Sequence, residues 1–76
     1  MASVQLEIID DMLERLEPRE ATVLRARFGL EDGTEHSRRE IASRLGVSAE
    51  RVRQMELAAL RRMREMAQRM DAPLAA

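Results

Sequence analysis

The sequence predicts an all-α fold of four or five helices, containing a helix-turn-helix and ending in a long helix. Apolar residues recur at helical spacings of three and four, and no stretch alternates apolar and polar residues as a strand would. Proline, glycine and serine stand where helices would begin or end. We expect one domain over residues 1–76, with a core of about 4–70 and a frayed tail at 71–76.

The first helix is predicted to run from Ser3, a suitable N-cap residue, to about Leu16. Its inner face carries apolar residues at helical spacing: Leu6, Ile8, Ile9, Met12, Leu13 and Leu16. Pro18 is expected at the first position of a second helix, where its fixed φ and missing N–H are harmless. This helix is predicted to turn Ala21, Leu24 and Phe28 inward and to stop at Gly29, a natural left-handed terminator.

The second half of the chain is predicted to hold two further helices. Ser37, with Glu40 three residues later, fits a capping box, and Gly46 is expected to end this short helix. Ser48 is expected to cap a last helix that extends to about Met70. Its apolar stripe is Val52, Met55, Ala59, Met63, Met66 and Met70. We expect this stripe to pack on the first helix; the alternative is an adaptable groove or a helix-pairing seam.

The composition argues against several classes of protein. The chain has no cysteine and one histidine, His36, so thiolate and zinc sites are not expected. There is no bilayer-length apolar run, no glycine-rich phosphate loop and no carboxylate pair isolated from arginines. We therefore expect a cytoplasmic, nucleoid-associated protein that is not an enzyme, with no catalytic residue, metal, cofactor, small-molecule substrate or membrane contact.

Charge is distributed unevenly, although the net charge is only −1. Residues 1–35 carry nine acids and four arginines, whereas residues 36–76 carry nine arginines and five acids. Such an asymmetry suggests an acidic supporting half and a basic half that could meet phosphates.

The two helices after Ser37 meet the constraints of a helix-turn-helix. With Arg38 at the first position, Ala42 takes the fifth, where a larger side chain would collide, and Gly46 the ninth, where φ must be positive. Apolar residues fill the corner: Ile41, Leu45, Val47, Val52 and Met55. The exposed face of the second helix then presents Ala49, Glu50, Arg53 and Gln54. In a major groove, glutamine can bind adenine, arginine can bind guanine, and glutamate can accept from the amino group of cytosine. The alternative is that this polar face is only solvated.

Two segments, LEPREATVLRARFGL (Leu16–Leu30) and REIASRLGVSAERVRQMELAALRRMR (Arg39–Arg64), resemble region 4 of sigma-70 family transcription initiation factors. The resemblance covers about Val4 to Arg64 and is most specific at RFGL and ERVRQ. It implies recognition of the promoter −35 element in double-stranded DNA and docking on the β flap of RNA polymerase core. An anti-sigma factor or a transcription activator is a further partner of the kind that such a domain would take.

The resemblance also implies roles for particular residues. Glu50, Arg53 and Gln54 would contact bases or their immediate surroundings, with Ala49 beside them. Phosphate contacts would come from Arg19, Arg27 and Ser37, with Arg38 and Arg39 nearby, and Arg51 would contact either a phosphate or an acid of the domain. The alternative for Arg19 and Arg27 is weak, exposed pairing with glutamates one turn away.

Departures from the family pattern change what the resemblance implies. Ala49 replaces an arginine that reads a guanine, Ala58 a frequent lysine, and Arg38 and Arg39 two mostly non-basic residues. Positive charge is thus moved to the helix before the recognition helix, which predicts weaker base discrimination and a larger phosphate contribution. The helical ending through Met66 and Met70 replaces a His-Pro pair and resembles alternative sigma factors.

Other readings stay open. A LuxR-like module shares the L-x-PRE-x-x-VL opening, but the RFGL and VRQ-x-E segments disfavour it. A protein–protein adaptor of the transcription machinery, with little DNA contact, is the alternative from another class. Whole sigma factors also bind the polymerase clamp and melt the −10 element, so we expect either an excised domain or a free-standing protein that reuses the fold.

Overall fold

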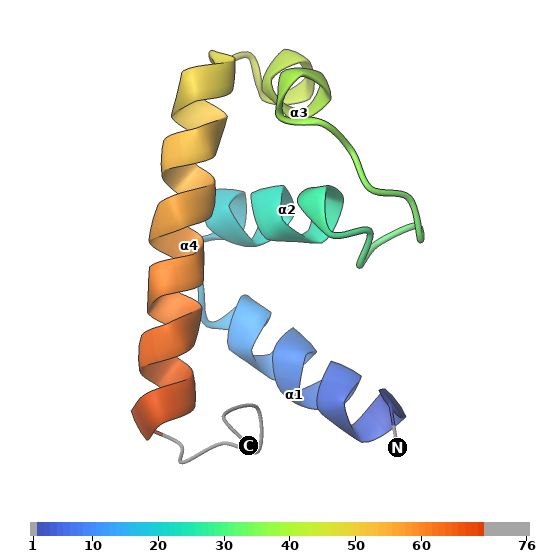
Figure 1. Ribbon diagram of the computed structural model, residues 1–76, viewed down its shortest axis with the longest axis vertical. Coiled ribbons are helices and arrows are strands. Elements are labelled where there is room, and N and C mark those ends of the chain that lie inside the picture. The colour runs from blue at the N-terminus through green and yellow to red at the C-terminus, as the bar shows by residue number, and fades with distance from the viewer. Residues whose placement is uncertain (1, 70–76) are drawn as a thin grey trace.

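A computed structural model of the chain describes residues 2–69, with side chains from residue 7 onward, and these residues form four helices: α1 (Ala2–Glu14), α2 (Pro18–Arg27), α3 (Arg38–Leu45) and α4 (Ala49–Arg69). The described residues contain no strand, so the prediction of an all-α fold with a long last helix is confirmed. Figure 1 shows α4 along the whole long axis, with α1, α2 and α3 on one side of it. None of the described helices is long and apolar enough to cross a membrane.

The boundaries of α1 differ from the prediction at both ends. The helix begins at Ala2, so Ser3 lies inside it and is not its N-cap. It ends at Glu14, where the N–H groups of Arg15 and Leu16 donate to carbonyls three residues back, at 3.1 Å each. The helix could not extend through Glu17 in any case, because the residue before Pro18 is forced into an extended conformation.

Pro18 opens α2 as predicted, but the prediction that Phe28 points into the core is wrong. Ala21 and Leu24 are buried, whereas Phe28 is 47% exposed. The helix ends at Arg27, and the chain leaves it through Phe28 and a left-handed Gly29 with φ 66°. The ring of Phe28 therefore lies beyond the buried face of the helix, 5.9 Å from the Arg27 guanidinium.

The segment from Gly29 to Ser37 returns the chain to α2 before α3 begins. The N–H of Leu30 donates to the Arg25 carbonyl at 2.9 Å, and that of His36 donates to the Ala26 carbonyl at 2.9 Å. Gly29 is required here for two reasons: its φ is positive, and a Cβ would lie only 3.3 Å from the backbone of Gly33.

The predicted ends of α3 and the predicted start of α4 are confirmed. The Ser37 hydroxyl accepts from the Glu40 N–H at 3.1 Å, while the Glu40 carboxylate accepts from the Ser37 N–H at 2.9 Å, which completes the capping box. Gly46 ends α3 with φ 70°, and the Ser48 hydroxyl caps α4 by accepting from the Arg51 N–H at 3.0 Å.

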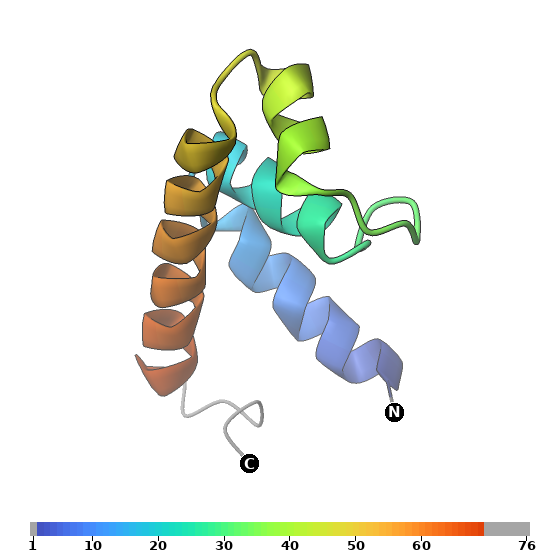
Figure 2. The same cartoon turned by 45° about the horizontal axis from the view of Figure 1, so that its top comes forward.

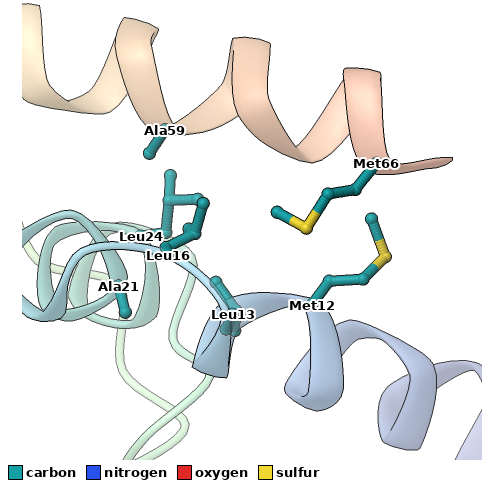
Figure 3. Close-up of a cluster of buried hydrophobic side chains, with 7 residues drawn as sticks. All are labelled: Met12, Leu13, Leu16, Ala21, Leu24, Ala59 and Met66. Atoms are coloured by element: carbon teal, nitrogen blue, oxygen red, sulfur yellow. The ribbon is translucent and has the colours of Figure 1, made fainter. Parts of the chain in front are cut away.

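Two apolar clusters hold the helices together, and both include α2 and α4. The first joins α1, α2 and α4 and is drawn in Figure 3: Met12, Leu13, Leu16, Ala21, Leu24, Ala59 and Met66. The second joins α2, α3 and α4: Val23, Ala26, Ile41, Ala42, Val52 and Met55. Consistent with this, α2 lies between α1 and α3 in Figure 2, so the first half of the chain supports the position of α3.

The methionine stripe of α4 is part of the core, but only its later part packs towards α1 as expected, since Met55 belongs to the second cluster with α2 and α3. Met55 and Met66 are buried, and Met63 is partly buried against the first cluster. Figure 3 shows Met66 of α4 facing Met12 of α1. These residues therefore do not form an open seam for a second helix. Met70 and the predicted frayed tail at 71–76 lie outside the described residues.

Candidate nucleic-acid interface

The corner between α3 and α4 has the geometry of a helix-turn-helix. Ala42 is buried where the two helices meet, and Gly46 turns the chain in the left-handed conformation. The N–H of Val47 returns to the Ala42 carbonyl at 3.1 Å, which closes the turn. Ile41, Val52 and Met55 fill the corner, with Leu45 and Val47 partly buried against them. All the residues predicted for the corner therefore occupy it.

The first two turns of α4 carry the residues that we expected to face bases. Ala49, Glu50, Arg53 and Gln54 are all exposed. Because Val52 and Met55 are anchored in the corner, the opposite side of the helix is free to enter a groove. The structure thus brings these four residues together on one accessible face.

Three of these side chains bind one another. Arg53 donates to both oxygens of the Glu50 carboxylate, from Nε at 2.9 Å and from Nη2 at 2.6 Å. The Gln54 amide donates to the same carboxylate at 3.4 Å. Arg53 holds the pKa of the Glu50 carboxyl below its usual value, and Glu50 raises the pKa of the Arg53 guanidinium. Both charged groups are therefore ionised at neutral pH and already paired with each other.

Ser37 and Glu40 form a second exposed feature at the start of α3. The Glu40 carboxylate accepts from the Ser37 N–H, and this hydrogen bond lowers the pKa of Glu40. A negative side chain thus already lies at the N-terminus of α3, where we expected a DNA phosphate. The neighbouring Arg39 is exposed and carries the opposite charge.

Glu56, for which no role was predicted from the sequence, lies among the buried residues of α4. Its side chain is only 7% exposed, and Oε1 accepts from Arg27 Nε and from Arg38 Nε, both at 3.0 Å. Oε2 accepts from Arg38 Nη2 at 3.3 Å. Arg27 also donates from Nη1 to the His36 carbonyl at 3.1 Å. One carboxylate thus joins the end of α2, the start of α3 and the second turn of α4.

The arginines of this cluster keep the Glu56 carboxylate charged despite its burial. Hydrogen bonds from Arg38 and then from Arg27 lower the pKa of Glu56, and Glu56 raises that of Arg38. The alternative considered for Arg27, pairing with a glutamate one turn away, is wrong, because its partner lies 29 residues further along the chain. Glu56 shares the apolar face of α4 with Val52 and Met55. The sequence therefore held one signal for this cluster, since a buried acid requires cations to pair with it.

The other predicted phosphate contacts are exposed and lie outside this cluster. They are Arg19 on α2, Arg39 on α3 and Arg51 on α4. Within the side chains described, from residue 7 to residue 69, none of the three forms an ion pair. Nor does any group of three acidic or histidine side chains in that range have the arrangement to hold a metal ion.

A pocket of about 450 Å³ lies away from this face, between the end of α1 and the last turns of α4. Leu16 and Met66 form its apolar wall. Four charged residues surround them: Arg15, Arg62, Glu65 and Arg69. Arg62 donates to the buried Glu20 of α2 at 3.0 Å, which fixes one side of the pocket. The hollow is predominantly basic, with Arg62 and Arg69 contributed by α4.

Four helices that place a helix-turn-helix on a supporting pair, with a polar face at the start of the last helix, define a helix-turn-helix domain. Comparison with known protein families shows to which family of helix-turn-helix domains the chain belongs. A family model described as "Sigma-70, region 4" matches residues 12–65, and the chain belongs to this family.

Two sigma factors are similar to the chain over most of its length. The RNA polymerase sigma factor RpoD of Neisseria gonorrhoeae is 47% identical over 58 residues, which are 76% of this chain and 9% of that protein. The RNA polymerase sigma factor SigA4 of Synechococcus elongatus is 48% identical over 65 residues, which are 86% of this chain and 21% of that protein. The chain therefore corresponds to a small part of each relative.

Proposed function

We propose that the chain reads a promoter −35-type element in double-stranded DNA and docks on RNA polymerase through the β flap, without any catalytic activity of its own. The observation that carries the DNA-reading part is the exposed face of Glu50, Arg53 and Gln54 beyond a closed helix-turn-helix corner. The membership in the region 4 family and the likeness to two RNA polymerase sigma factors support it.

In this proposal the first two turns of α4 enter the major groove, with Ala49 at the entrance. Gln54 bonds an adenine, Arg53 a guanine and Glu50 the amino group of a cytosine, which are the pairings that their donors and acceptors favour. Arg53 and Glu50 occupy each other's bidentate edges, so this pair has to open before the Nε–Nη2 edge of Arg53 can bind a guanine.

Phosphate contacts would come from the exposed groups around this face. We assign Arg19, Arg39, Arg51 and the Ser37 hydroxyl to direct contacts. Arg27 and Arg38, with 27% and 42% of their side chains exposed, would position α3 through Glu56 and offer their remaining N–H groups to the DNA backbone. Such contacts fix the register of the domain without carrying sequence information.

The test is fluorescence anisotropy with a −35-type duplex and a scrambled duplex at two salt concentrations. We expect salt-sensitive binding that prefers the first duplex by less than about a hundredfold, because Ala49 lacks the guanine-reading arginine of the family. Absence of binding to both duplexes at high micromolar protein would overturn the DNA-reading function. A preference far above a hundredfold would contradict the role of Ala49.

The pocket at the end of α1 supports the second part of the proposal. Its apolar wall of Leu16 and Met66 suits an apolar segment of the β flap, and its arginines suit acids beside that segment. Arg15→Glu should weaken binding to RNA polymerase core, whereas Arg64→Glu, an exposed change of the same charge on α4, should not. Equal effects of the two variants would place the docking surface elsewhere. Loss of polymerase binding with intact DNA binding would separate the two functions.

A further inference from the structure

Two of the exposed side chains at the start of α4, Arg53 and Gln54, are hydrogen-bonded to a third, Glu50. The guanidinium of Arg53 binds both oxygens of the Glu50 carboxylate, and the Gln54 amide reaches the same group. Two parallel N–H···O bonds of this kind are the strongest geometry available to an arginine and a carboxylate. Neither side chain is buried, with 44% of Arg53 and 57% of Glu50 exposed, so the pair lies where DNA would approach.

The pairing of Arg53 with Glu50 matters for the attraction of phosphates because few other positive charges lie near it. Ala49 carries no charge, and the positive charge of Arg38 is directed to Glu56. In the first two turns of α4 this leaves Arg51 as the cation without an ion pair among the described side chains. The state of Arg53 therefore determines how strongly this part of the helix attracts phosphates.

We propose, on the basis of the DNA-reading function above, that Glu50 masks Arg53 in the free protein and is a specificity-determining residue through this contact. The carboxylate occupies the Nε–Nη2 edge of Arg53 and neutralises its charge, so a phosphate gains the full attraction of this guanidinium only by displacing the carboxylate, which would then remain unpaired beside a like charge. DNA of arbitrary sequence thus gains little from Arg53. The Glu50 contact lowers affinity for DNA of the wrong sequence, which is a separate source of specificity from attraction to the correct site.

At a matching site the same contact opens without loss of partners. A cytosine amino group can take the Glu50 carboxylate while guanine O6 and N7 take the Arg53 fork. Both groups released from the pair are then bonded again. At a mismatched site one of the two charges stays in the groove without a partner, so opening the pair is unfavourable there.

The experiment is a double-mutant cycle with Glu50→Gln, Arg53→Gln and the double variant. Binding of each protein to a scrambled duplex is measured by fluorescence anisotropy at low salt, where exposed charges act most strongly. Glu50→Gln removes the mask and also one negative charge. The change of affinity that it causes in the Arg53→Gln background measures the charge effect alone.

We expect Glu50→Gln to raise affinity for the scrambled duplex about two- to fivefold more in the wild-type background than in the Arg53→Gln background, as befits an exposed ion pair. Glu14→Gln removes the same charge from the exposed last residue of α1, on another helix, and should show no such dependence on Arg53. Equal effects in both backgrounds would overturn the mask while leaving the DNA-reading function intact. Failure of all the proteins to bind any duplex would overturn that function and the mask with it.

Discussion

Arg38, the first residue of α3, binds Glu56, two turns into α4, through Nε at 3.0 Å and Nη2 at 3.3 Å. The same carboxylate binds Arg27, the last residue of α2, at 3.0 Å. Apolar packing alone could allow α3 to slide on α4, because dispersion and burial have no direction. Directed hydrogen bonds from two helices to one buried oxygen restrict that motion. Glu56 thus sets the angle at which the helix-turn-helix is presented.

We expect Glu56→Gln to lower the free energy of unfolding by about 1–3 kcal/mol, since hydrogen bonds between charged groups are weakened while both arginines can still reach water. Urea denaturation followed by circular dichroism measures the change. Glu14→Gln, an exposed change of the same kind on α1, is the control and should change stability by less than about 0.5 kcal/mol. If the two variants were equally stable, the cluster around Glu56 would have no structural importance.

Stability should fall on acidification. The pKa values of Glu56, Glu50, Glu40 and Asp32 are lowered in the folded chain from their ordinary values of 4.5 for the glutamates and 3.8 for the aspartate. A lowered folded pKa means that the contribution is complete above the unfolded value and is lost as the pH falls through the folded one. The melting temperature should therefore be level near neutral pH and decline below about pH 4.5.

The Glu56→Gln variant also tests the origin of that decline. It removes one of the titrating groups, so its melting temperature should depend less steeply on pH below about pH 4.5 than that of the wild type. A variant with an unchanged acid slope would show that Glu56 does not contribute to it. A wild-type melting temperature that rises on acidification would contradict the direction of all four pKa shifts.

Glycine substitutions should separate backbone strain from steric contact. Gly46→Ala should lower the free energy of unfolding by about 1–2 kcal/mol, because its φ of 70° is strained for alanine. Nothing lies within 4 Å of the added Cβ, so no steric contact adds to this loss. Gly29→Ala should cost more, because φ is 66° and the Cβ would also meet backbone atoms at 3.3 Å. Gly46→Asn is the matched control and should cost less than Gly46→Ala, since asparagine tolerates the left-handed conformation better. The reverse order for Gly29 and Gly46, measured by thermal unfolding, would contradict this geometry.

Gln54→Ala should weaken binding to a preferred −35-type duplex by about 1–3 kcal/mol and affect a scrambled duplex much less. The reason is that an amide bonded to a base edge carries sequence information, whereas phosphate contacts do not. Gln68→Ala changes the same residue type at the far end of α4 and should leave both affinities unaltered. Equal losses for both duplexes would remove Gln54 from the base-reading set.

Features that depend on neighbouring residues could be predicted from the sequence. The start of α2 at Pro18, the capping box of Ser37 and Glu40 and the turn at Gly46 are as predicted. Each depends on backbone or side-chain bonds between residues no more than a few positions apart. The helical periodicity that placed Val52, Met55 and Met66 in the core has the same local origin.

The prediction failed where a helix boundary or a distant partner decided the outcome. Phe28 follows the spacing of the buried residues of α2, but the helix ends one residue before it, and the ring is exposed. Ser3 has the chemistry of an N-cap, yet α1 begins before it. Helix ends are set by competing local bonds that differ little in energy, so small tertiary effects shift them.

The sequence by itself therefore determined the order of the helices, the corner of the helix-turn-helix and the exposed face at the start of α4. Only the tertiary structure decided which acid pairs with which arginine. Glu56 meets Arg38 across 18 positions and Arg27 across 29, and Glu20 meets Arg62 across 42. Spacing along a chain cannot specify such pairs, because many arginines could reach each acid in the unfolded state. Burial of the apolar clusters brings particular ones together and makes every alternative costly.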